Sequence, residues 1–146
     1  MDDFSSGDFS YLPWDADDGW DVDDSNTNIG GYSAHFSGNV EVGGFRALSV
    51  EVSSVTGGAV SVQIHADVGM PYDQALIYID EEVVQGYPAK TGGFVIFNYD
   101  LDAGTHTIGF RVWRPNFNPP NPRNETVNGS GQAWIDEFQF YPNSPV

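Results

Sequence analysis

Cysteine is missing from the 146-residue sequence, and this one absence removes several kinds of chemistry. A chain without cysteine forms no disulfide bond, offers no thiolate to a metal ion and has no cysteine nucleophile. The absence does not argue against secretion.

Basic residues are scarce as well. Five Lys and Arg stand against 21 Asp and Glu, which gives a formal net charge of −16. Such a surface repels the phosphate backbone of nucleic acids and the anionic headgroups of membranes. We therefore expect no nucleic-acid partner. Cations fit this charge, as do basic partners and neutral ones such as polysaccharide or cell-surface glycan.

Long apolar runs are also absent, since none approaches the roughly 18 residues that a membrane-spanning helix needs. We expect no membrane insertion, and no secretory signal peptide is visible. The length is typical of one domain. We expect residues 1–146 to form a single β-sandwich module that was excised from a longer chain.

The sequence contains instead a series of short alternating stretches, and no stretch has the apolar spacing of a helix. In residues 59–66, Val60, Val62 and Ile64 share one face, while Ser61 and Gln63 share the other. Glycine pairs at 30–31, 43–44, 57–58 and 92–93 supply turns. We predict strands in 47–53, 59–66, 75–84, 93–101, 105–113 and 131–141, and an all-β fold: an antiparallel β-sandwich of the jelly-roll type.

Residues 114–131 interrupt this pattern with four proline and five asparagine residues. Such a segment does not pair regularly in a sheet. A loop of this length is either functional or a mobile insertion at the rim of the sandwich, and both interpretations stay open. Asn124 and Asn128 within it match the acceptor pattern for N-glycosylation.

Three stretches carry a resemblance to a known group of domains: "FSSGDFSYLPW", "DAGTHTIGF" and "AWIDEFQF". In their order, over Phe4 to Phe140, the chain resembles the MAM-like and choice-of-anchor-type jelly-roll modules of extracellular bacterial and marine algal proteins. It is more distantly similar to cleaved-adhesin domains. The resemblance implies an extracellular or cell-surface location within a larger secreted protein, and a non-catalytic role in adhesion, carbohydrate contact or scaffolding. The chain departs from the pattern in "IDEEVV", which lacks the glycine usual after the aspartate, and in the long 114–131 segment.

Six aspartates crowd into residues 15–24, and carboxylates at this spacing can converge on calcium, which takes six to eight oxygen ligands. The run is not an EF-hand loop, because Gly19 stands at the fifth position and Asn26 at the twelfth. Asp15, Asp17 and Asp21 are candidate ligands if other parts of the chain complete the site. The alternative is that the run is a solvated acidic face.

Asp136, in the last predicted strand, is the candidate for the further ligand that would complete such a calcium site. Strict alternation through "AWIDEFQF" would place Trp134, Asp136, Phe138 and Phe140 on one face. A carboxylate among aromatic core residues needs a partner, because an unpaired buried charge is too costly. The resemblance implies calcium there, with Asp136 as a ligand and Asp3 or Asp8 as a further one. An ion pair with Arg46 or Arg111 is the alternative.

Carbohydrate contact is predicted at the end of the 105–113 strand. Alternation turns Ile108, Phe110 and Val112 toward the core, and Arg111 and Trp113 away from it. An outward tryptophan beside an arginine is typical of binding patches. We name Trp113 and Arg111 as the main candidates, with the loop aromatics Tyr72 and Phe117. The alternative is that Trp113 packs beneath the proline-rich segment.

An enzyme is not expected. His35, His65 and His106 are scattered, without a second histidine at metal-ligand spacing. No serine-hydrolase, nucleotide-binding or zinc-protease motif occurs. We therefore expect a calcium-stabilised, non-catalytic module for adhesion or glycan contact. The alternatives are a structural spacer or acidic matrix domain without a discrete ligand, and a small polysaccharide-active enzyme.

Overall fold

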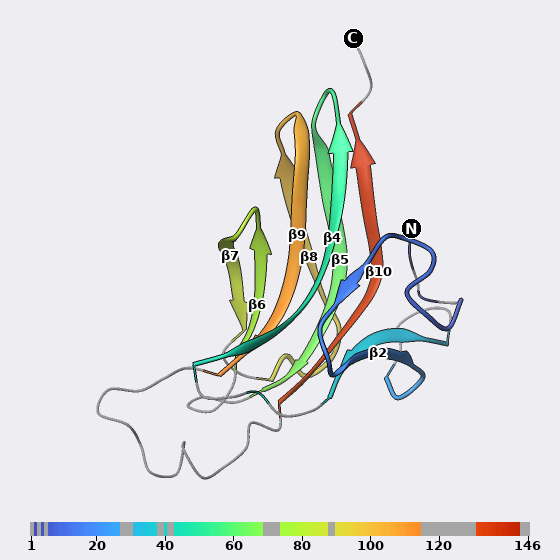
Figure 1. Cartoon of the computed structure of the whole chain (residues 1–146), viewed down its shortest axis with the longest axis vertical. Helices are drawn as coiled ribbons and strands as arrows, with labels where there is room; N and C mark the ends of the chain where they lie inside the picture. Colours follow the sequence, from blue (N-terminus) through green and yellow to red (C-terminus); the bar gives the residue numbers. More distant parts are fainter. Residues whose placement is uncertain are drawn as a thin grey trace.

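The computed structural model describes residues 2, 4, 6–26, 31–37, 40, 43–68, 74–87, 90–114 and 131–143. Its strands form two five-stranded sheets that lie one over the other (Figure 1). The first sheet has the order β1-β4-β9-β6-β7, and the second has the order β2-β3-β10-β5-β8. The bounds are β1 (Asp15–Ala16), β2 (Trp20–Asp23), β3 (Ser33–Phe36), β4 (Phe45–Ser54), β5 (Gly58–Asp67), β6 (Gln74–Ile79), β7 (Glu82–Tyr87), β8 (Val95–Leu101), β9 (Gly104–Trp113) and β10 (Gln132–Pro142).

The core lies between the inner faces of the two sheets, as alternation predicts. From the first sheet it takes Leu48, Ile108 and Phe110, and from the second Val60 and Val62, each at most 1% exposed. Every strand pair in the described ranges is antiparallel. The predicted all-β antiparallel sandwich is therefore confirmed. No helix in the described ranges is long and apolar enough to span a bilayer.

The predicted strand over 75–84 is in fact a hairpin, so its prediction as one strand was wrong. β6 ends at Ile79, and β7 begins at Glu82 after a two-residue turn. Asp80 and Glu81 both have positive φ, 51° and 69°, as the tight turn of a hairpin requires. The turn was hard to predict from the sequence because neither residue is glycine or asparagine.

The predicted shared face of Trp134, Asp136, Phe138 and Phe140 is also wrong. β10 carries a β-bulge between Asp136 and Gln139, where Glu137 has a φ of 51°. A bulge adds one residue to its strand and so exchanges the faces beyond it. Ala133 and Ile135 face the core before the bulge, and Phe138 packs in the core after it. Trp134 and Asp136 therefore point to the opposite side of the second sheet.

The N-terminal segment is joined to the end of β10. Asp2 and Phe138 exchange two backbone hydrogen bonds, of 2.7 and 2.9 Å. The Asp2 side chain is 2% exposed and accepts hydrogen bonds from the Phe4 backbone N–H and from the Trp14 indole, both at 2.8 Å. Trp14 packs against the core, and Trp20 is buried.

Candidate functional site

Two aromatic side chains contact one arginine on the outer face of the first sheet, and a third belongs to the same strand face. Arg111 and Trp113 alternate with the core residues of β9 and so point away from the core. Phe45 of β4 lies directly across from Trp113, and Tyr78 of β6 lies across from Gly109. We call Phe45, Tyr78, Arg111 and Trp113 the aromatic–arginine cluster.

Arg111 is held in a fixed position within this cluster. Its guanidinium carbon lies 3.8 Å from the centre of the Tyr78 ring and 4.3 Å from the centre of the Phe45 ring, which is cation–π geometry. Its Nη2 donates a 2.6 Å hydrogen bond to Glu81 at the β6–β7 turn. Its Nε is buried and has no hydrogen-bond partner among the described residues. An unpaired buried donor is unfavourable, which marks Arg111 as an unusual feature of this face.

The surface beside the cluster is hollowed. A small, enclosed hollow of about 50 Å³ is lined by Ala47, Ser49, Tyr78, Glu81, Thr107, Gly109 and Arg111. A more open depression of about 300 Å³ is lined by Pro13, Asp15, Ser49, Val50, Glu51 and Thr107. Ser49 and Thr107 line both hollows, so the two lie side by side on the outer face of the first sheet, and we call the pair, from β1 to β6, the transverse groove.

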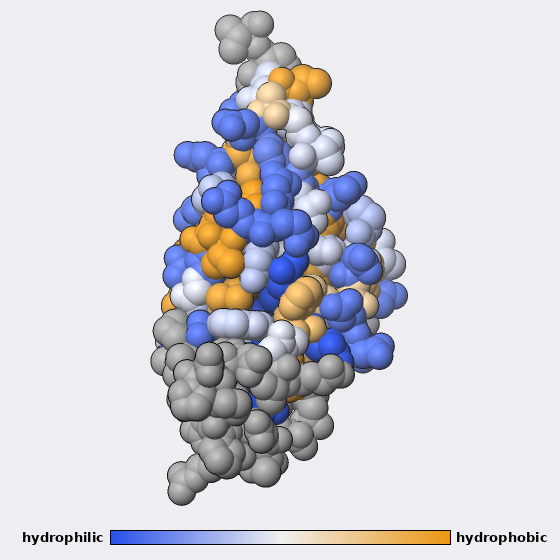
Figure 2. Space-filling view, turned by 60° about the vertical axis from the view of Figure 1, so that its left-hand side comes forward, coloured by the Kyte–Doolittle hydropathy of each residue, from blue (hydrophilic) through white to orange (hydrophobic). Residues whose placement is uncertain are grey.

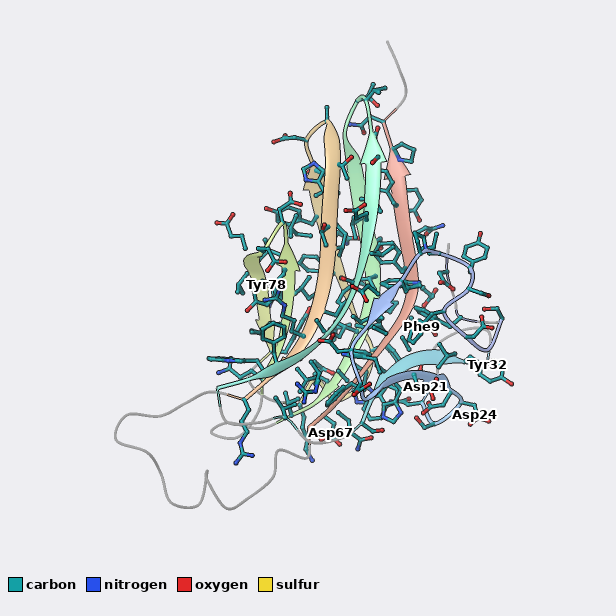
Figure 3. The ribbon with its side chains drawn as sticks, viewed as in Figure 1. Phe9, Asp21, Asp24, Tyr32, Asp67 and Tyr78 are labelled. Carbon is teal, nitrogen blue, oxygen red and sulfur yellow. The ribbon has the colours of Figure 1, made fainter. Side chains whose placement is uncertain are left out.

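The surrounding surface is mostly polar. Figure 2, turned so that the β6–β7 side of the molecule comes forward, shows hydrophilic side chains over most of the described surface, with small apolar patches between them. In Figure 3, Tyr78 lies on the β6 side of the molecule, whereas Asp21 and Asp24 lie beside β2, at a distance from it. Asp21 and Asp24 therefore lie apart from the aromatic–arginine cluster.

The structure brings together two of the four predicted carbohydrate-binding residues, Arg111 and Trp113. Tyr72 and Phe117 lie outside the described residues. Sequence reasoning missed Tyr78 and Phe45, although alternation carried a signal for both. Tyr78 stands between the core residues Ile77 and Ile79, and Phe45 shares its strand face with residues 47 and 49.

The predicted metal ligands are spread over both sheets. Asp15 lies on β1 opposite Ser49 in the first sheet, and Asp21 lies on β2 opposite His35 in the second. Asp17 accepts a 2.8 Å hydrogen bond from the Ala47 N–H. In the part of the chain that the structure describes, no three His, Cys, Asp or Glu side chains are grouped so that they could hold a metal ion. Asp3 lies outside the described residues.

Asp136 is the candidate ligand that the structure buries completely, at 0% exposure. Its Oδ1 accepts a 2.8 Å hydrogen bond from the Glu137 N–H at the bulge. Arg111, one alternative partner, pairs with Glu81 instead. The backbone of Asp2 pairs with that of Phe138, and Phe138 stands two residues after Asp136 in β10. Calcium at this position stays a prediction.

The histidines hold elements together. His106 Nδ1 lies 2.6 Å from Asp80 Oδ2, and its Nε2 lies 2.8 Å from the Asp102 carbonyl oxygen. Both partners only accept hydrogen bonds, so this geometry favours the doubly protonated, cationic imidazole. The hydrogen bond to Asp80, with that to Asp102, raises the pKa of His106 above its ordinary value. The Asp80 pKa is lowered in turn by the His106 hydrogen bond and by the Thr107 N–H.

A second aromatic group lies on the outer face of the second sheet. Trp134 stacks on His35 with ring centres 4.6 Å apart and contacts His65 at 4.9 Å. The Trp134 indole donates a 2.9 Å hydrogen bond to Ser25, and Asn26 bonds His65. Burial lowers the pKa of His65, while the Asp67 charge opposes this shift. Because Trp134 is only 7% exposed, this group packs the segment after β2 onto the sheet.

No protein-family model matches the sequence, and no curated protein matches it. Solved structures do match the fold. TmCBM61, in complex with β-1,4-galactotriose, has a TM-score of 0.63 at 16% identity, with 96% of this chain and 94% of that chain covered. The K3 cleaved adhesin domain of Lys-gingipain from Porphyromonas gingivalis has a TM-score of 0.64 at 13% identity, with 97% of each chain covered.

A third match is the CBM22-2 xylan-binding domain from Paenibacillus barcinonensis. Its TM-score is 0.54 at 13% identity, with 97% of this chain and 98% of that chain covered. At these identities the likeness establishes the jelly-roll sandwich, of the kind seen in carbohydrate-binding and cleaved-adhesin domains. The distant similarity to cleaved-adhesin domains is thus confirmed for the fold, and the MAM-like resemblance stays a prediction.

Proposed function

We propose that this chain is a non-catalytic, extracellular module that binds polysaccharide through the outer face of its first sheet. The observation that carries the proposal is the aromatic–arginine cluster beside the transverse groove. Sugar sites combine aromatic surface with a few fixed polar groups in a concave surface. Here Tyr78 and Trp113 offer the rings, and Arg111, held by Glu81, offers the fixed donor.

The similar structures support this proposal in general terms. One is described in complex with β-1,4-galactotriose, and another is described as xylan-binding. The cleaved-adhesin match agrees with the adhesion role that the resemblance implies. The net charge of −16 also favours a neutral glycan over a nucleic acid or an anionic membrane surface.

Removing one ring of the cluster tests this site. We expect Tyr78→Ala and Trp113→Ala each to weaken binding to the retained polysaccharide at least about tenfold, because buried aromatic contacts dominate binding energy. The measurement is affinity electrophoresis in gels that contain β-1,4-galactan or xylan. Ile96→Ala is the matched control, because Ile96 is an exposed apolar residue, at 62%, on the other sheet.

Three outcomes would count against the proposal. Absence of retardation by any glycan on an array would favour the structural spacer or acidic matrix domain. Unchanged retardation of both variants would place binding elsewhere on the molecule. Release of labelled sugar from the polysaccharide would favour the polysaccharide-active enzyme.

We also propose that calcium stabilises the module by binding between the N-terminal segment and β10. The support is the buried carboxylate of Asp136 on β10, two residues before Phe138, whose backbone pairs with that of Asp2. The dispersal of Asp15, Asp17 and Asp21 over the two sheets gives no further support. A hard cation with oxygen ligands would offset the cost of burying a carboxylate.

Removal of calcium tests this second proposal. A ligand that binds only the folded state at about a hundredfold excess over its Kd adds about 2.7 kcal/mol to the free energy of unfolding. We therefore expect the melting temperature to rise by about 5–10 °C between EDTA and millimolar calcium. Asp136→Asn should abolish the difference, and magnesium serves as the control ion. Coincident melts in EDTA and calcium would rule the site out.

A further inference from the structure

We propose that the transverse groove, with Gly109 as its floor, takes a segment of polysaccharide that crosses the strands and carries no acidic groups. This inference rests on the proposed function. It adds the direction in which the glycan lies, the residue that makes room for it and the charge of the ligand.

The direction follows from strand register. Asp15 of β1 lies opposite Ser49 of β4, Ser49 lies opposite Gly109 of β9, and Gly109 lies opposite Tyr78 of β6. These four residues therefore form one row across four neighbouring strands. At the usual strand spacing the row is about 14 Å long, which suits a short oligosaccharide segment better than a single sugar. The two neighbouring hollows are lined by members of this row, Asp15 and Ser49 in the outer one and Ser49, Gly109 and Tyr78 in the inner one.

Gly109 leaves the space at the centre of the row. It does not have the positive φ that would make glycine necessary for the backbone. A Cβ built there meets only the Tyr78 Cβ at 3.7 Å and the Ser49 Cβ at 3.9 Å, which are ordinary contacts. A side chain is thus sterically possible at this position, yet none is present. Glycine inside a strand is unfavourable by itself and often marks the close approach of a ligand.

Polar groups line this space. Ser49 and Thr107 border both hollows, and their hydroxyl groups can donate and accept hydrogen bonds. Arg111 borders the inner hollow, and its buried Nε has no partner among the described residues. The ring of Tyr78 forms one wall.

The charges of the groove select against acidic glycans. Asp15 and Glu51 border the outer depression, and Glu81 borders the inner hollow. The Arg111 guanidinium is the single cation that lines either hollow among the described residues, and it is paired with Glu81 at 2.6 Å. A uronate or sulfate would lie near like charges, with no unpaired cation beside it in the described part of the chain. This repulsion weakens its binding relative to that of a neutral sugar. Neutral hydroxyl groups meet no such penalty.

The experiment fills the groove without disturbing the fold. Gly109→Val adds a branched side chain at the floor, and valine suits a strand, so its melting temperature should equal or exceed that of the wild type. Gly86→Val is the matched control, because Gly86 lies on β7 outside the groove and its Cβ would meet only the end of the Leu76 side chain, at 3.4 Å. Gly109→Ala provides a smaller step if Gly109→Val folds poorly.

Affinity electrophoresis with four probes gives the answer. β-1,4-galactan and arabinoxylan are the neutral probes, and galactan oxidised at C6 and glucuronoxylan are their acidic counterparts. We expect a neutral probe to retard the wild type and Gly86→Val alike, and Gly109→Val at least about tenfold less. We expect weaker retardation by the acidic counterpart at low salt, where charge repulsion is least screened.

The possible failures are distinct. If no probe retards the wild type, the proposed function fails and the groove fails with it. If the wild type is retarded and Gly109→Val is retarded equally, the groove is overturned while binding elsewhere stands. If the acidic probe retards the wild type as strongly as the neutral one, the charge selectivity is overturned.

Discussion

Replacing Trp14 with alanine is expected to lower the free energy of unfolding by about 3–5 kcal/mol, the usual cost of removing a packed aromatic side chain. The Trp14 ring lies 5.1 Å from Phe138, 5.7 Å from Phe4 and 6.4 Å from Phe110 between ring centres. The substitution also removes the indole donor from the buried carboxylate of Asp2. Urea unfolding followed by fluorescence and circular dichroism measures the loss.

The conservative variant Trp14→Phe separates packing from hydrogen bonding. It keeps most of the apolar contact but leaves Asp2 Oδ2 without its indole partner, which should cost about 1–3 kcal/mol. Asp2→Ala in the same background should then cost less than in the wild type, because the two residues share one hydrogen bond. Trp20→Phe is the matched control, because its indole donates to the Arg46 carbonyl oxygen and not to a carboxylate.

Additive effects of Trp14→Phe and Asp2→Ala, within about 0.5 kcal/mol, would show that the indole–carboxylate bond does not stabilise the fold. Coupling of about 1 kcal/mol or more would show how an acidic N-terminal segment is attached to an aromatic core. The attachment then needs no cation at Asp2, since neutral donors satisfy both carboxylate oxygens.

The strands and the core could be predicted from the sequence because they depend on local alternation. Ile108, Phe110 and Val112 follow the period of two, and all three are at most 1% exposed. The same pattern correctly turned Arg111 and Trp113 away from the core, and these are two of the four residues of the aromatic–arginine cluster. Alternation also turns Tyr78 and Phe45 away from the core, but their place beside Arg111 and Trp113 depends on the pairing of β9 with β4 and β6, which a single sequence does not reveal.

The errors share one physical cause, which is backbone at positive φ in residues other than glycine. Glu81 turns the β6–β7 hairpin, and Glu137 forms the bulge of β10. Such conformations are uncommon outside glycine, asparagine and aspartate, and composition gives little sign of them. At Glu81 the positive φ forms the turn that places its carboxylate beside the Arg111 guanidinium.

The acidic run could not be resolved from the sequence because its members have different partners in space. Asp17 accepts from a β4 backbone N–H, and Asp23 lies 2.6 Å from His35 on β3. Carboxylates that are neighbours along the chain are therefore divided between two sheets by the crossing from β1 to β2. Spacing alone predicted convergence, whereas strand pairing separates them.

Adding a single methyl group at Gly58 is expected to destabilise the protein by about 1–3 kcal/mol, as overpacking does. Gly58 begins β5 and lies between Pro142 of β10 and Leu101 of β8 in the register. Its Cβ would lie against the Tyr141 carbonyl oxygen and 2.8 Å from Cε1 of Phe140. The carbonyl belongs to the backbone of the neighbouring strand, so the clash is relieved only by moving that strand. Thermal melts of Gly58→Ala measure the effect.

Gly109→Ala is the matched substitution with the opposite expectation. Both glycines lie in strands and lack positive φ, so alanine changes the unfolded chain similarly at the two positions. At Gly109 the nearest atoms are 3.7 and 3.9 Å away, and stability should stay level or rise by up to about 1 kcal/mol. If both variants melted at or above the wild type, β5 and β10 would not approach each other as closely as described. If only Gly58→Ala lowers the stability, the packing of neighbouring strands explains the glycine at 58. The open groove then remains the explanation for the glycine at 109.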